Sequence, residues 1–143
     1  MPLGGFAASR ELMEKLTSNP VLGHITTFGG HPVCCAASLA AGKFIINHNL
    51  VEQVMEKELL FFKLLKHPEI KEIRSAGLMM GVELGSFDKV LKVISYGLEN
   101  GIITDWFLHC NTALRIAPPL TISKDEIHLA CQTILEGLNQ NSH

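Results

Sequence analysis

The sequence has little charge of either sign and no long apolar run. Charged residues make up 18% of its 143 residues, acidic and basic side chains are interspersed, and the formal net charge is −2. We therefore expect no basic face for nucleic acid and no nucleic-acid partner. No apolar run approaches the length that spans a bilayer, so we expect no membrane partner either.

Cysteines in metal-binding pairs are also missing. The four cysteines, at positions 34, 35, 110 and 131, have no metal-ligand spacing, and the seven histidines are scattered along the chain. The sequence therefore predicts no metal site. Adjacent Cys34 and Cys35 cannot easily bridge each other within a helix. We interpret all four cysteines as reduced thiols, which favours a cytoplasmic location.

The remaining composition is that of a folded domain, since 47% of the residues are hydrophobic. Helical spacing of apolar residues predicts helices over 32–47, from Asn49 to about 65, over 87–98 and over 123–138. Asn49 and Glu52 form a capping-box pattern at the start of the second helix. Strands are predicted at 70–74, 78–84, 102–108 and 113–117. The sequence pattern changes at Pro68, from helical spacing before it to short predicted strands after it. We take Pro68 as the domain boundary, with units 1–67 and 68–143.

A polar loop runs directly into a helix at residues 24–41. Thr26 and Thr27 precede two glycines, and Pro32 suits the first helical turn because its missing N–H costs nothing there. Hydroxyl groups and free amides at a helix N-terminus favour an anion such as a phosphate or a carboxylate. Alternatively, the threonines and glycines only shape a turn and cap the helix.

Arg115 is the second candidate. It lies in the apolar strand Leu-Arg-Ile-Ala just before a double proline, where a rigid guanidinium could bind a carboxylate through two parallel hydrogen bonds. Strand alternation places Arg115 on the face opposite Leu114 and Ile116. The alternatives are an exposed strand arginine or one half of a structural ion pair. We interpret Arg74 as structural and Glu83 as a solvated carboxylate.

Four segments then resemble the class III (ornithine/acetylornithine type) pyridoxal-phosphate (PLP) aminotransferases. Residues 26–32, Thr-Thr-Phe-Gly-Gly-His-Pro, are similar to that family's Ser/Thr-Thr-Phe/Tyr-Gly-Gly-Asn-Pro motif. Residues 73–84 resemble its Arg-Gly-x-Gly-Leu-Met-x-Gly-Val-Glu block, and residues 114–122 resemble its Leu-Arg-x-x-Pro-Pro-Leu-x-Ile segment. Residues 1–6 resemble the glycine-rich turn that follows the cofactor lysine. The four segments occur in the family's order.

The resemblance implies an α/β fold, the C-terminal part of a fold-type I PLP-dependent transferase. Residues 1–67 would be the end of the PLP-binding large domain with the interdomain helix, and residues 68–143 the small α+β domain. Thr27 would contact the cofactor phosphate, in this family that of the neighbouring subunit of a homodimer, with Thr26 beside it. Arg115 would bind the α-carboxylate of an amino acid or a 2-oxo acid such as 2-oxoglutarate.

The sequence also departs from the family pattern. His31 stands where the family usually has Asn, and Ser75 where it often has Gly. The lysine that forms the Schiff base with PLP would lie about half a dozen residues before Met1, so this chain contains no catalytic residue of its own. We therefore expect the chain alone to be inactive in transamination. The alternative is a non-catalytic truncated module that only binds a ligand or dimerises.

Overall fold

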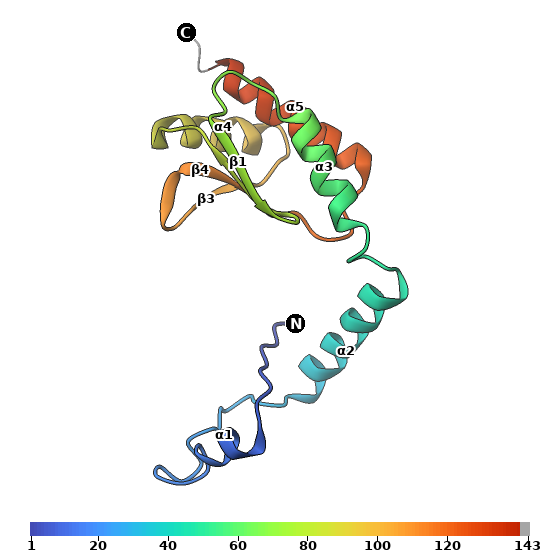
Figure 1. Ribbon diagram of the computed structural model, residues 1–143, viewed down its shortest axis with the longest axis vertical. Helices are drawn as coiled ribbons and strands as arrows, with labels where there is room; N and C mark the ends of the chain where they lie inside the picture. The colour runs from blue at the N-terminus through green and yellow to red at the C-terminus, as the bar shows by residue number, and fades with distance from the viewer. Residues whose placement is uncertain (141–143) are drawn as a thin grey trace. The chain divides into compact units, whose positions relative to one another are not determined.

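The computed structural model describes residues 1–140, which divide into two compact units (Figure 1). The first unit comprises residues 1–48 and the second begins at Asn49. The domain boundary predicted at Pro68 stays a prediction. In this chain the helix before Pro68 packs with the second unit, because its residue Phe61 and the next residue after the helix, Leu65, belong to that unit's core.

The first unit consists of two helices and the loop between them. Helix α1 (Arg10–Glu14) begins after Ser9, whose side chain accepts a hydrogen bond from the backbone N–H of Leu12. Helix α2 (Pro32–Asn47) has the predicted bounds and carries Pro32 in its first turn. No residue of this unit is buried. The unit therefore has no core of its own.

The second unit is an antiparallel four-stranded sheet with three helices (Figure 1). The strands follow the order β1-β2-β4-β3. Helix α5 packs against both α3 and α4, and α4 packs against β4. The elements, in chain order, are α3 (Val54–Leu64), β1 (Glu72–Ala76), β2 (Met79–Glu83), α4 (Phe87–Glu99), β3 (Asp105–Phe107), β4 (Cys110–Ile116) and α5 (Lys124–Asn139).

The core lies on one face of this sheet. Alternate residues of β2 and β4 are buried against side chains of the three helices, whereas the residues between them point to the other face. The core side chains on the sheet are those of Met80, Val82, Leu114 and Ile116. The face away from the helices is thereby left for Gly81, Glu83 and Arg115.

One predicted helix start is wrong and another is confirmed. The predicted cap at Asn49 does not form: Asn49 has φ +49°, and α3 begins only at Val54, after Gln53, which makes no side-chain cap. Asparagine tolerates this left-handed conformation, which excludes it from a helical N-terminus. Ser123 and Glu126, in contrast, form a complete capping box at the start of α5.

Candidate functional site

A row of paired residues crosses the open face of the sheet. Arg74 of β1 pairs with Gly81 of β2, Gly81 pairs with Arg115 of β4, and Arg115 pairs with Asp105 of β3. The row carries two arginines separated by a glycine. A Cβ atom at Gly81 would lie 3.1 Å from the Phe107 ring, so this position has little room for a side chain.

The Arg115 side chain is 44% exposed, and its Nη2 atom donates to Asp105 Oδ2 over 3.3 Å. Its backbone is fixed, because the Thr104 hydroxyl donates to the Arg115 carbonyl oxygen over 2.5 Å. The predicted alternation is confirmed, since Leu114 and Ile116 are buried and Arg115 is exposed. The structure therefore presents to solvent a guanidinium that extends from an anchored backbone and has one weak, single-contact partner.

The chain that follows Arg115 is held by a lysine that sequence reasoning missed. Lys57 of α3 is 7% exposed, and its Nζ donates to the Leu120 carbonyl oxygen over 2.6 Å. The backbone N–H of Ile122 donates to the Pro119 carbonyl oxygen in the same turn. The only sequence signal for Lys57 is its position on the apolar stripe of α3, between Val54 and Phe61. This contact of its buried ammonium fixes the backbone segment that follows β4.

Two hollows adjoin Arg115. A cavity of about 550 Å³ runs along residues 115–119 and is closed by apolar side chains of α3 and α5, among them Phe61 and Ile134. A smaller hollow of about 220 Å³ is lined by both Arg115 and Asp105. Arg115 is the only cationic residue that lines either hollow in the described part of the chain. An anionic group entering here would meet its guanidinium.

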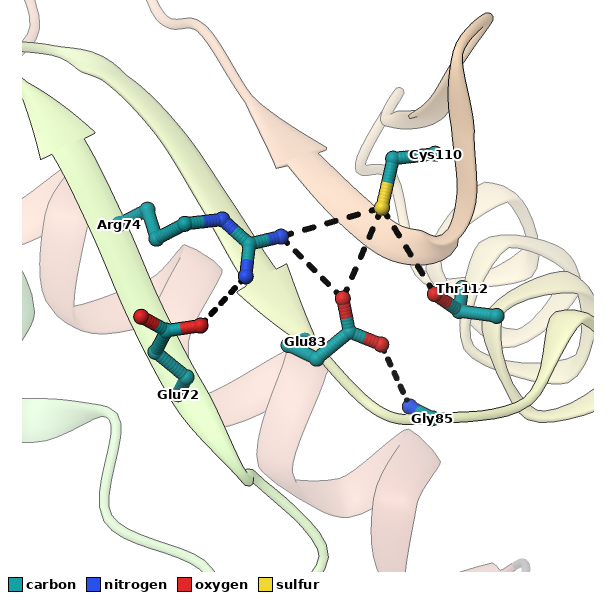
Figure 2. Close-up of polar contacts among 6 residues, drawn as sticks. All are labelled: Glu72, Arg74, Glu83, Gly85, Cys110 and Thr112. Atoms are coloured by element: carbon teal, nitrogen blue, oxygen red, sulfur yellow. Dashed lines mark hydrogen bonds and ion pairs between the residues drawn. The ribbon is translucent and has the colours of Figure 1, made fainter.

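Glu83, which the sequence led us to interpret as solvated, is the centre of a polar cluster (Figure 2). Its side chain is 17% exposed; Oε2 accepts from Arg74 Nη2 at 3.2 Å, and Oε1 accepts from the Gly85 N–H at 2.9 Å. Cys110 Sγ lies 3.6 Å from Oε2. Arg74 also pairs with Glu72, so both of its carboxylate partners belong to the sheet, and its interpretation as a structural residue stays a prediction.

The cluster lowers the pKa of Glu83 below its ordinary value of 4.5, through a hydrogen bond from Thr112 first and then through those from Arg74 and Gly85, against the opposing effect of burial. A carboxyl group whose pKa is lowered by folding stabilises the fold at pH values above its ordinary pKa. This contribution is lost as the pH falls through the pKa of the folded state.

We expect Glu83→Gln to lower the free energy of unfolding by about 1 kcal/mol at pH 7. Urea unfolding from pH 7 to pH 3 should show this difference shrinking, and a constant difference would contradict it.

The Thr26–Gly30 loop leads into α2 as predicted. Thr26 and Thr27 are both exposed, and a Cβ atom at Gly29 would lie 2.8 Å from the Thr26 hydroxyl oxygen. Gly30 has φ +71°, and His31, the N-cap residue of α2, makes no side-chain cap. The His31 Nδ1 atom is buried without a hydrogen-bond partner. Two hydroxyls beside an uncapped helix N-terminus are a donor set that fits a phosphate group.

Comparison with known proteins decides the family. The profile of the class III aminotransferases matches residues 1–138. This chain belongs to the class III aminotransferase family. The family is PLP-dependent, and the chain has the fold of part of a fold-type I PLP-dependent transferase. The α/β fold inferred from the resemblance is thereby confirmed.

Two similar curated proteins are ornithine aminotransferases. The chain is 37% identical to ornithine aminotransferase of Oceanobacillus iheyensis over 140 residues. The aligned region covers 96% of the chain and 33% of the relative. The chain is 36% identical to ornithine aminotransferase 2 of Staphylococcus aureus, covering 93% of the chain and 33% of the relative. The chain thus spans about one third of the length of these curated relatives.

Solved structures agree with this fold. A Bacillus anthracis aminotransferase superimposes with a TM-score of 0.79 at 31% identity, over 92% of this chain and 34% of that one. Ornithine aminotransferase from Toxoplasma gondii superimposes with a TM-score of 0.75 at 29% identity, over 91% of this chain and 31% of that one. The latter structure shows partial occupancy of PLP at its active site.

Residues 1–140 hold no cluster of three or more His, Cys, Asp or Glu side chains suited to a metal ion. No helix among them is both long and apolar enough to cross a membrane.

Proposed function

We propose that this chain supplies the substrate-binding arginine and the phosphate-binding threonines of a PLP-dependent aminotransferase. The reaction moves an amino group between an amino acid of the ornithine or acetylornithine type and a 2-oxo acid such as 2-oxoglutarate. The observation that carries the proposal is Arg115, whose accessible guanidinium extends from an anchored backbone beside two hollows in a chain of the class III family.

The role of Arg115 is to bind and orient the substrate carboxylate. A guanidinium offers two parallel N–H donors to one carboxylate, which fixes both its position and its plane. The anchored Arg115 backbone and the Lys57 contact to Leu120 hold the strand end against the core. This rigidity supports the proposal, because a catalytic site gains most from groups that do not have to be ordered during the reaction.

Thr26 and Thr27 would hold the phosphate of PLP, together with the first N–H groups of α2. The loop fits this group, because the hydroxyls are exposed and the helix N-terminus is not capped by a side chain. When bound, PLP supplies an electron-withdrawing ring that makes the proton beside the amino nitrogen easier to remove. The lysine that holds the cofactor and moves this proton would lie upstream of Met1.

The assembly is proposed from the same family pattern. Residues 1–67 would complete the large domain and residues 68–143 would form the small domain of an enzyme that is a homodimer in the cytoplasm. The exposed apolar side chains of the first unit support a partner surface that covers them. Phe6, Phe28 and Ile46 are each more than 70% exposed there.

The alternative is a non-catalytic module that retains only ligand binding or dimerisation. Both proposals predict that the chain alone does not transaminate when PLP and an amino acid are added. The two proposals differ in the ligand-binding sites that they require in this chain. An aminotransferase site requires a carboxylate at Arg115 and a phosphate at Thr26 and Thr27, whereas a dimerisation module requires neither.

Two-dimensional NMR of the ¹⁵N-labelled chain tests the proposal. Adding 2-oxoglutarate should shift the Arg115 side-chain signal and the amides around it, with a Kd of about millimolar order. Adding inorganic phosphate should shift the amides of residues 26–34 instead. If neither ligand produces these localised shifts, the proposed binding roles are wrong. Turnover of an amino acid by the chain with PLP would contradict the proposal that the lysine lies elsewhere.

A further inference from the structure

The Arg115 guanidinium already faces a carboxylate, that of Asp105. The two residues are directly opposite each other on β3 and β4, and Nη2 lies 3.3 Å from Oδ2. Building on the proposed role of Arg115, we propose that Asp105 is a specificity-determining residue. It competes with a bound carboxylate for Arg115, and it favours ligands that carry a cationic amino group beside that carboxylate.

The geometry of this ion pair allows a ligand carboxylate to share Arg115 or to displace Asp105 from it. A charge-assisted N–H···O contact is ordinarily about 2.7–2.9 Å, so 3.3 Å through one nitrogen leaves most of the guanidinium donors to a ligand. Both side chains are nearly half exposed, at 44% and 47%. Solvent therefore screens the pair, and it contributes little to folding.

Asp105 is held in place without Arg115. Its Oδ1 atom accepts a hydrogen bond from the backbone N–H of Trp106 over 2.8 Å. The Trp106 ring packs edge-on against Phe87 with centroids 5.4 Å apart, which fixes this end of β3. The negative charge therefore stays at the site when a ligand takes the guanidinium.

A ligand in the smaller hollow would meet both charges, because Arg115 and Asp105 line it together. Its carboxylate would be attracted by Arg115 and repelled by Asp105. Two unit charges about 4 Å apart in water interact strongly enough to change an affinity about fivefold. An ammonium next to the ligand carboxylate adds an attraction to Asp105 that offsets this repulsion. Asp105 thus favours an α-amino acid over the 2-oxo acid of the same skeleton.

Glutamate and 2-oxoglutarate form the matched ligand pair for the test, since they differ only at the carbon next to the carboxylate. We expect Asp105→Asn to bind 2-oxoglutarate about fivefold more tightly and to bind glutamate no more tightly than the wild-type chain does. Calorimetry or NMR titration of the 143-residue chain gives both constants. Asparagine keeps an oxygen for the Trp106 N–H, and Asp105→Ala serves as a second variant with the same expected direction.

Asp88→Asn is the control, because it removes the same charge from an exposed residue of the same unit and should change neither constant. Equal changes for both ligands in Asp105→Asn, or no change, would overturn the proposal for Asp105. The proposed function fails separately if Arg115→Ala binds 2-oxoglutarate as well as the wild-type chain does. If neither ligand binds the wild-type chain, both proposals are wrong.

Discussion

Arg115→Ala is expected to lower the affinity of the chain for 2-oxoglutarate by about 10- to 100-fold. A hydrogen bond to a charged group contributes about 1.5–3 kcal/mol, which corresponds to this range. Arg115 is also the only cation lining the two hollows among the described residues, so no neighbouring side chain can replace it. The loss should appear in the dissociation constant measured by titration.

One further variant separates the guanidinium from its charge, and a second serves as a control. Arg115→Lys keeps the charge but not the planar pair of donors, and an intermediate affinity is expected. Arg74→Gln is the matched control, because Arg74 lies on the same face of the sheet with a side chain 47% exposed but is occupied by Glu72 and Glu83. An affinity that falls equally in Arg74→Gln and Arg115→Ala would point to general electrostatics rather than to a site at Arg115.

Phe61→Ala is expected to destabilise the second unit by about 3–5 kcal/mol. Phe61 is fully buried in the core that α3 forms with the sheet and α5. Removing its ring loses the transfer free energy of the buried carbons and leaves a void that the packed helices cannot close. A domain of this size is stable by about 5–15 kcal/mol, so the substitution removes a large part of the total.

Leu59→Ala is the control for this prediction. Leu59 lies two residues away on the same helix, but its side chain is 61% exposed. Its substitution should change the free energy of unfolding by less than about 0.5 kcal/mol. Urea unfolding of the two variants and the wild-type chain measures both values. Similar losses in the two variants would contradict the prediction, because the loss would then not depend on burial in the core.

Local chemistry alone determined several elements of this protein. The bounds of α2 follow from Pro32 and from the polar residues after Asn47, and the start of α5 follows from the Ser123 capping box. Each signal acts between residues a few positions apart, so the sequence displays it directly. Strand alternation in the same way places Arg115 opposite Leu114 and Ile116 before the partners of β4 are known.

The start of α3 shows where local chemistry misleads. Asn49 and Glu52 have the spacing of a capping box, yet Asn49 adopts φ +49° and the next residue, Leu50, is buried. Burial of Leu50 and a turn at residues 48–53 together set the start of the helix at Val54. The same sequence pattern is compatible with a cap and with a left-handed turn, and the packing chooses between them.

The partners of the site residues were decided only by the tertiary structure. Asp105 faces Arg115, Arg74 reaches Glu83, and Lys57 binds the Leu120 carbonyl across 63 residues of sequence. These contacts depend on the strand order β1-β2-β4-β3 and on the register of each pair. A one-residue slip would preserve every local pattern and yet change every partner. Burial of one sheet face selects the register.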